Sequence, residues 1–176
     1  AARKVGLWAS EEIVFRHCFP KYSTKLLELG CGVGRISFSL WMLGYHNLTA
    51  SDVSKKMVIR ASKIQMERRS TINFIKEDAT KLSFPSNVYD GVIFGFNGLM
   101  QIPHRENRKK AMNECFRVLQ PGGRFVFTSH DRGIPKWKKF WVNERKKWRI
   151  GLQDKALIEF GDRYGETPTG RLFIHV

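Results

Sequence analysis

Three glycines at alternate positions, Gly30, Gly32 and Gly34, have the spacing in this chain that is best suited to chemistry. Because glycine has no side chain, the backbone can turn sharply there and a ligand can approach it closely. The apolar run 25–29 predicts a buried strand before the turn, and a helix after it would point free N–H groups at the ligand. Asp52 is expected at the end of the next strand, about 20 residues on, where its carboxylate can accept both hydroxyls of a ribose. This combination predicts a nucleotide-type site.

The spacing of the glycines also indicates which nucleotide-type ligand to expect. A dinucleotide fingerprint, G-x-G-x-x-G, that began at Gly30 would need its third glycine at position 35, which is Arg35. The run from Glu28 to Gly34 instead resembles the acidic-x-G-x-G-x-G first motif of class I S-adenosylmethionine-dependent methyltransferases.

Four further segments resemble motifs of the same family, in the same order. The segment 49–54 (TASDVS) is similar to the acidic motif of the second strand, and 76–79 (KEDA) to the segment whose aspartate flanks the adenine. The segments 89–94 (YDGVIF) and 118–124 (VLQPGGR) resemble the fourth strand and the entry to the fifth. Together the matches span the chain from Leu26 to roughly Ser129, which is more than half of its length, and the resemblance implies methyl transfer from S-adenosylmethionine.

The resemblance also implies the residues that hold this cofactor. It places the three glycines around the methionine part, Asp52 on the ribose and Glu28 near the amino group. Asp78 and Ala79 would lie at the adenine, although for Asp78 a helix cap or turn cap is the alternative. The cofactor carries a sulfonium and an ammonium but no phosphate, so acidic residues and bare backbone suit it. The predicted cofactor-binding residues are Glu28, Gly30, Cys31, Gly32, Gly34, Asp52, Val53, Asp78, Ala79 and Phe94.

Alternating strand and helix patterns support an α/β fold built on a doubly wound, mostly parallel sheet, the Rossmann-like fold of class I methyltransferases. We expect strands at 25–29, 47–51, 72–75, 91–95 and 124–129. Helices are expected at 35–43, from Ser54 onward with Met57, Ala61 and Ile64 facing inward, and at 105–119 with Ala111, Met112, Cys115, Val118 and Leu119 facing inward. A turn at 120–123 precedes the fifth strand.

The length of 176 residues suits a single domain, which we divide into four parts. Residues 1–24 form a helical lead-in, and 25–129 form the cofactor-binding core. The segment 130–170 would cover the substrate, with a basic aromatic helix at 133–149 and a loop at 161–170. Residues 171–176 form a late strand. Since family members finish the sheet with a helix and an antiparallel strand, the C-terminal strands are expected to be incomplete.

The sequence gives weaker evidence for the residues that act on the methyl acceptor. His130 and Asp131 follow the fifth strand and are the candidates for a general base or a substrate contact, with His104 a weaker one. Phe96 and Leu99 follow the fourth strand and are either substrate contacts or core residues. Because transfer from a sulfonium is downhill, holding the reacting atoms in line can lower the barrier by about 7–11 kcal/mol without a base.

A formal net charge of +15 adds attraction for anionic partners. Eight Lys or Arg residues against the single acid Glu144 lie between 132 and 149, interleaved with four aromatics. We favour a lid whose apolar face covers a small-molecule acceptor. An RNA methyltransferase that uses the basic surface is the alternative. A non-catalytic cofactor-binding module of the same fold is a third hypothesis.

The cysteines and the hydropathy pattern indicate the setting. Cys18, Cys31 and Cys115 are widely spaced and form no zinc-ligand pattern, so we predict no metal site and a reducing, cytoplasmic location. No stretch approaches the roughly 18 apolar residues of a membrane helix, which predicts a soluble protein.

Overall fold

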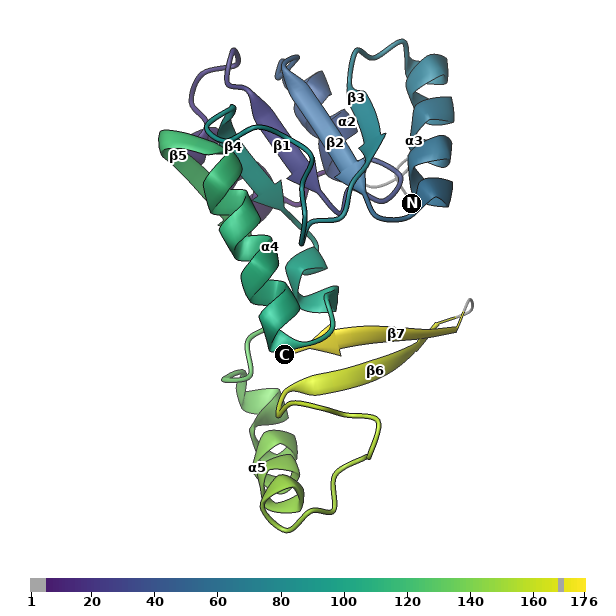
Figure 1. Ribbon diagram of the computed structural model, residues 1–176, viewed down its shortest axis with the longest axis vertical. Coiled ribbons are helices and arrows are strands. Elements are labelled where there is room, and N and C mark those ends of the chain that lie inside the picture. The colour runs from purple at the N-terminus through teal and green to yellow at the C-terminus, as the bar shows by residue number, and fades with distance from the viewer. Residues whose placement is uncertain (1–5, 168–169) are drawn as a thin grey trace.

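A five-stranded parallel sheet forms the centre of the molecule (Figure 1). The computed structural model describes residues 6–167 and 170–176. The strand order is β3-β2-β1-β4-β5, which confirms the predicted doubly wound fold. The strands are β1 (Leu26–Leu29), β2 (Leu48–Asp52), β3 (Asn73–Lys76), β4 (Tyr89–Phe94) and β5 (Leu119–Phe127).

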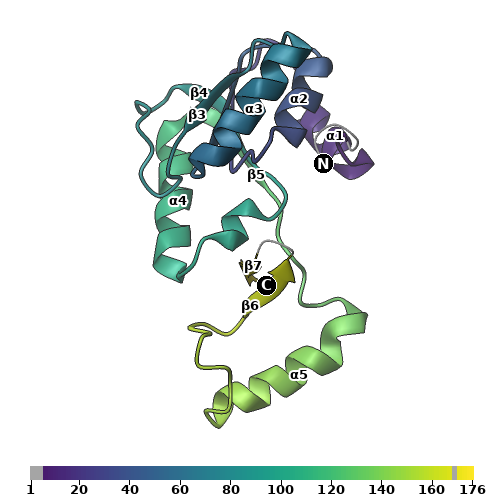
Figure 2. The same cartoon turned by 90° about the vertical axis from the view of Figure 1, so that its right-hand side faces the viewer.

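Helices cover both faces of this sheet, and each face has its own hydrophobic core (Figure 2). On one face, Phe38 and Ala61 pack with Leu26 and other sheet residues. On the other face, Cys115 packs among residues of β1 and β4. The first face carries α1 (Ala9–Cys18), α2 (Arg35–Met42) and α3 (Lys55–Arg68), and the second carries α4 (Arg105–Val118), which follows a short 3-10 helix, η1 (Gly98–Gln101).

The segment after β5, described over residues 128–167 and 170–176, faces the carboxyl ends of the parallel strands. It contains helix α5 (Pro135–Arg149) and an antiparallel hairpin of β6 (Asp162–Thr167) and β7 (Gly170–His175). In Figure 1 the arrowheads of β1, β2 and β4 point toward this hairpin, and β7 packs against η1. Among the described residues, no helix combines the length and hydropathy needed to cross a bilayer.

The expectation of a loop at 161–170 is wrong over 162–167, where the chain forms β6, and the first residue of β7, Gly170, falls in the same range. The register pairs Asp162 with His175 and Glu166 with Arg171. Glycines at 161 and 165 gave the segment a loop-like composition. The partner strand supplies the backbone hydrogen bonds that a local pattern cannot reveal. Residues 168 and 169, like 1–5 of the lead-in, lie outside the described residues.

Two methionines expected on inner helix faces are instead exposed. Met57 of α3 and Met112 of α4 keep 41% and 45% of their surface accessible. Their neighbours Ala61 and Ile64 on α3, and Ala111 on α4, are buried as predicted. The buried stripe of each helix is thus narrower than the apolar pattern indicated.

The fifth strand begins earlier than the sequence indicated. Leu119, expected to end α4, already pairs with Tyr89, and Arg124 pairs with Gly91. The ladder shifts register between these two pairs, so the expected turn at 120–123 is an irregularity within β5 rather than a connection before it.

Candidate functional site

The glycine turn after β1 is left-handed at all three glycines, with φ of 63° at Gly30, 56° at Gly32 and 86° at Gly34. A side chain at Gly30 would lie 2.8 Å from the ring of Phe94, and one at Gly34 would lie 2.8 Å from the ring of Phe38. A side chain at Gly32 would meet no atom within 4 Å. Gly30 and Gly34 therefore permit packing, whereas Gly32 leaves bare backbone facing open space.

This difference gives a prediction for two alanine variants. Gly32→Ala is expected to weaken S-adenosylmethionine binding. It should also lower the free energy of unfolding by about 1–2 kcal/mol, because alanine is strained in a left-handed conformation. Gly34→Ala bears the same strain and must also displace Phe38, which adds about 1–3 kcal/mol. Urea unfolding and binding calorimetry would measure both effects. Equal losses of stability in the two variants, or unchanged binding by Gly32→Ala, would contradict these roles.

Asp52 at the end of β2 faces the glycine turn. Its Oδ2 accepts a hydrogen bond from the amide of Gly32 at 2.8 Å, and its Oδ1 accepts one from the amide of Ser54 at 2.8 Å. A carboxylate has about four lone-pair sites, so both oxygens can still accept a ribose hydroxyl. The side chain is partly exposed. Its chemistry and placement fit the sugar of the expected cofactor.

Glu28 lies in β1, two residues before Gly30, and only 2% of its surface is exposed. Its Oε2 accepts a hydrogen bond from the hydroxyl of Ser37 on α2. Burial raises the pKa of Glu28 to about 7, although Ser37 and the positive charge of Arg35 favour the ionised form. An ammonium group bound beside this carboxyl would stabilise the ionised form further.

Cys31 lies within the glycine turn, and Val53 directly follows Asp52. Cys31 is buried, its thiol lies 3.6 Å from the carbonyl oxygen of Gly32, and burial raises the pKa of that thiol. Cys31 therefore stays neutral at ordinary pH. Val53 is 64% exposed, so a bound ligand has apolar surface to cover there.

Asp78 and Ala79 follow β3 at the same edge of the sheet. In the parallel register Asp52 stands beside Lys76, and Asp78 comes two residues later. The Oδ1 of Asp78 accepts hydrogen bonds from the amide and the hydroxyl of Thr80, both at 2.8 Å. Asp78 therefore caps a turn, which was the alternative. Ala79 packs on the second core.

The candidates for acting on the acceptor are not gathered at one point. His130 and Asp131 are exposed, and the Oδ1 of Asp131 accepts a hydrogen bond from the amide of Gly133 at 2.6 Å, which braces a turn. Leu99 is fully buried, as a core residue would be, whereas Phe96 is exposed. His104 is also exposed, just before α4.

A cluster that sequence reasoning missed fastens the N-terminal segment over the start of α2. Arg35 forms two hydrogen bonds of 2.6 Å with the carboxylate of Glu11, which is buried. The guanidinium lies over the rings of Trp8 and Phe96, and these two rings lie 5.7 Å apart. Since Phe96 follows β4, the cluster joins the lead-in to the carboxyl edge of the sheet. No local pattern signals this contact, because 24 residues separate its charged partners.

A cavity of about 1000 Å³ lies between α4, η1 and the segment that leads into the hairpin. Leu99, Met100 and Phe160 give it apolar walls. Sequence reasoning missed this cavity because its lining comes from segments that lie far apart in the sequence, from Leu99 to His175. The charged and titratable residues of its lining are His104, Arg105, Glu106, Arg108, Lys109, Arg132, Glu159 and His175.

Comparison with known proteins gives curated relatives that are methyltransferases. The ubiquinone/menaquinone biosynthesis C-methyltransferase UbiE of Zymomonas mobilis is 32% identical over 135 residues, 76% of this chain and 52% of the relative. The eEF1A lysine and N-terminal methyltransferase of Homo sapiens is 28% identical over 147 residues, 80% of this chain and 21% of the relative. The chain thus spans about half the length, or less, of these relatives.

Solved structures share the fold. The PH0226 protein of Pyrococcus horikoshii OT3 has a TM-score of 0.69 at 27% identity, over 94% of this chain and 71% of that one. An S-adenosylmethionine-dependent methyltransferase of Methanosarcina mazei has a TM-score of 0.71 at 18% identity, over 97% and 78%. The family model for the methyltransferase domain matches residues 27–127, from β1 to the last residue of β5. The chain therefore belongs to the class I S-adenosylmethionine-dependent methyltransferase family.

Proposed function

We propose that this chain is the cofactor-binding and catalytic part of an enzyme that transfers a methyl group from S-adenosylmethionine to a small-molecule acceptor. The observation that carries the proposal is the contact between the carboxylate of Asp52 and the amide of Gly32. It puts a hydrogen-bond acceptor for the ribose directly beside the bare backbone where the methionine part would lie. Residues 25–129 form the cofactor core in this proposal, and 130–170 face the acceptor.

The chain's own residues bind and orient the reactants. The bound cofactor supplies a methyl group activated by its sulfonium. Asp52 accepts hydrogen bonds from the ribose, and Glu28 favours the ammonium through its negative charge. The Gly32 backbone lets the sulfur end approach closely. With the cofactor fixed at these points, proximity and alignment of the acceptor lower the barrier by about 7–11 kcal/mol.

Two observations favour a small acceptor. The cavity of about 1000 Å³ lies at the upper end of the range for small-molecule pockets, which is roughly 300–1000 Å³. The UbiE relative is named as a C-methyltransferase of ubiquinone and menaquinone biosynthesis, and these quinones are small molecules.

The basic surface of α5 supports RNA as a second candidate acceptor. A hollow of about 300 Å³ there is lined by Trp141, Val142 and five cations. Within residues 6–167 and 170–176, none of these cations forms an ion pair, because Glu144 is engaged by Lys147 and Arg163. Phosphate contacts could use this charge. The five cations are Arg132, Lys138, Arg145, Lys146 and Arg149.

Methyl transfer from radiolabelled S-adenosylmethionine tests the proposal and separates the two acceptor classes. We expect calorimetric binding of the cofactor and label transfer into a pool of small metabolites. Label in RNA, lost when Lys138 and Lys146 are changed to glutamine, would instead support the second candidate. Cofactor binding without any transfer would point to a non-catalytic module, and failure of the folded protein to bind the cofactor would overturn the proposal.

A further inference from the structure

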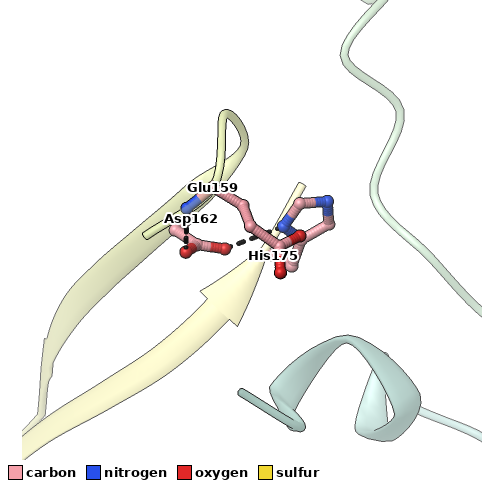
Figure 3. A group of neighbouring side chains, drawn as sticks. All are labelled: Glu159, Asp162 and His175. Carbon is pink, nitrogen blue, oxygen red and sulfur yellow. Dashed lines mark hydrogen bonds and ion pairs between the residues drawn. The ribbon is translucent and has the colours of Figure 1, made fainter. Parts of the chain in front are cut away.

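A histidine and a buried aspartate form a hydrogen-bonded pair across the C-terminal hairpin (Figure 3). His175 on β7 and Asp162 on β6 stand opposite each other in the strand register. The Nδ1 of His175 lies 2.9 Å from Oδ1 of Asp162, and only 2% of the Asp162 side chain is exposed. The Oδ2 of Asp162 accepts hydrogen bonds from the amides of Ile158 at 3.1 Å and Glu159 at 2.8 Å. The carboxylate is therefore fixed by the backbone.

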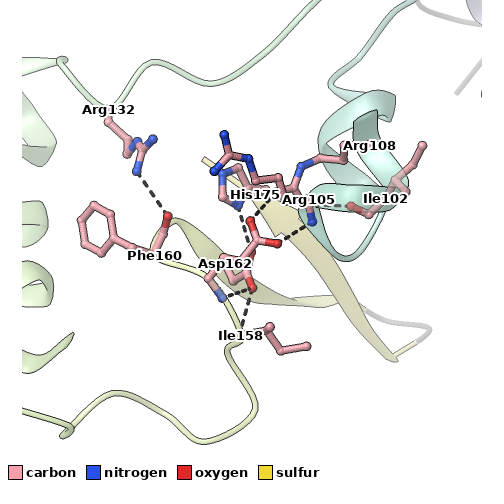
Figure 4. A network of polar contacts seen from close by, with 9 residues as sticks. Ile102, Arg105, Arg108, Arg132, Ile158, Phe160, Asp162 and His175 are labelled. Carbon is pink, nitrogen blue, oxygen red and sulfur yellow. Dashed lines mark hydrogen bonds and ion pairs between the residues drawn. The ribbon is translucent and has the colours of Figure 1, made fainter. Parts of the chain in front are cut away.

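Glu159 stands close enough to this pair to resemble a metal site, since one ligand atom of each residue lies within 4.8 Å of the others. The carboxylate oxygens are already engaged by N–H donors, however (Figure 4). Glu159 accepts hydrogen bonds from the amide of Arg105 and, at 2.7 Å, from the guanidinium of Arg108. A cation at this point would have to displace those donors, so the arrangement favours orientation of His175 over metal binding.

The pairing with Asp162 selects one tautomer of the neutral His175 ring. A carboxylate can only accept a hydrogen bond, so in the neutral imidazole Nδ1 is the donor and Nε2 keeps its lone pair. No hydrogen bond to Nε2 forms within the described ranges. The ring lies against Gly161, where φ is 119° and a side chain would lie 2.8 Å from Cε1. Glycine at 161 thus leaves room for the imidazole.

His175 also lines the large cavity, with 17% of its side chain exposed. Leu99 and Met100 of η1 line the same cavity. A side chain at Gly98, the first residue of η1, would lie 2.6 Å from the ring of Phe94, the ring that also abuts Gly30. The helix η1, which supplies Leu99 and Met100 to the cavity, therefore packs through the ring of Phe94 on the glycine turn of the proposed cofactor site.

The charges around the cavity favour an anionic occupant. Arg108 is buried and neutralised by Glu159, but no acid in the described part of the chain forms an ion pair with Arg105, Lys109 or Arg132. These three positive charges outnumber the one remaining acid of the lining, Glu106. Apolar side chains make up much of the remaining wall, and they suit a flat ring. They are Leu99, Met100, Met112, Trp148, Ile158 and Phe160.

We propose that this cavity holds an aromatic hydroxy acid as methyl acceptor and that His175, positioned by Asp162, is its general base. This rests on the proposed methyltransferase function. Nε2 of His175 takes the proton of the acceptor hydroxyl, and the oxygen forms a bond to the methyl carbon. The carbon–sulfur bond breaks and its electron pair returns to sulfur, which becomes a neutral thioether. The carboxylate of the acceptor lies near Arg105, Lys109 and Arg132.

Nitrogen NMR of the histidine rings tests the pair without relying on turnover. We expect the proton of His175 on Nδ1 in the free protein, and a shifted Nε2 resonance when 4-hydroxybenzoate is added as the probe. Phenol, which lacks the carboxylate, should shift it much less at equal concentration. The exposed His130 is the internal control and should not respond. A proton on Nε2, or no response of His175 to 4-hydroxybenzoate, would overturn the proposal.

Measurements of kcat in variants of His175 and Asp162 distinguish the role of the general base from that of its positioning residue. His175→Gln should lower kcat with 4-hydroxybenzoate by roughly 100-fold or more, the usual contribution of a general base. Asp162→Asn should lower kcat and alter the proton position on His175, and Asp162→Glu should restore part of both. All three variants should bind S-adenosylmethionine within twofold of the parent, whereas failure of the parent to bind it would refute the proposed function instead. A kcat unchanged by His175→Gln would refute the assigned base.

Discussion

Asp52→Ala is expected to weaken S-adenosylmethionine binding by roughly 100-fold or more in calorimetry. Two hydrogen bonds from ribose hydroxyls to a charged acceptor contribute about 1.5–3 kcal/mol each, and about 3 kcal/mol corresponds to that factor. The same substitution also removes the acceptor of the Gly32 and Ser54 amides. A looser glycine turn would therefore add to the loss.

A modified ligand distinguishes the loss of the ribose hydrogen bonds from the effect of a looser glycine turn. An analogue of S-adenosylhomocysteine without ribose hydroxyls should bind the parent weakly, and Asp52→Ala should affect its binding far less than that of the natural product. This non-additivity measures the direct contact. Asp131→Ala, which makes the same change in charge at an exposed turn, is the matched control and should leave binding unchanged. Equal effects of Asp52→Ala on both ligands would show that Asp52 only braces the turn.

The backbone geometry of the proposed cofactor half of the site was predictable because its signals are local. A strand, a left-handed turn and a helix N-terminus follow one another within residues 26–42, and each needs a residue type that the sequence displays. Asp52 was predictable for a related reason, since parallel strands bring their carboxyl ends to one edge. The contact of its carboxylate with Gly32 is a consequence of that topology.

The proposed acceptor half was not predictable because its contacts join distant segments. Asp162 and His175 meet only through an antiparallel pairing, and the glycines at 161 and 165 concealed the strand character of β6. Arg108 and Glu159 are 51 residues apart, yet they form an ion pair that ties α4 to the segment before the hairpin. His130, the histidine favoured from its position in the sequence, is exposed and has no such partner in the described part of the chain.

Glu28 is expected to make both stability and cofactor binding depend on pH. Burial raises the pKa of Glu28 from 4.5 to about 7, so between these values the folded state holds a proton that the unfolded state has released. The free energy of unfolding should therefore fall as pH rises from 4.5 to 7, by about 3 kcal/mol, and this contribution should then level off. Urea unfolding at several pH values measures it. The contribution of Glu28 is the difference between the parent and Glu28→Gln.

Glu28→Gln keeps an oxygen that can accept the hydrogen bond from Ser37 and never carries a charge. The variant should match the parent in stability near pH 5 and exceed it near pH 8, since only the parent must then bury a carboxylate. It should bind S-adenosylmethionine more weakly at pH 8, because the ammonium loses its negative partner. The ionised Glu28 carboxylate would thus strengthen cofactor binding while it lowers the stability of the folded protein. A variant with the stability profile of the parent would show that Glu28 titrates alike in the folded and unfolded states.

The same carboxyl should release a proton when the cofactor binds. Near pH 6 most of Glu28 is protonated in the free protein, given its pKa of about 7, and an adjacent ammonium would favour the ionised form. Binding enthalpies measured in phosphate and in a buffer of larger ionisation enthalpy should therefore differ by the heat of that proton. The difference should vanish above pH 8 and in Glu28→Gln at any pH. A proton release that persists in Glu28→Gln would place the linked group elsewhere and remove Glu28 from the ammonium site.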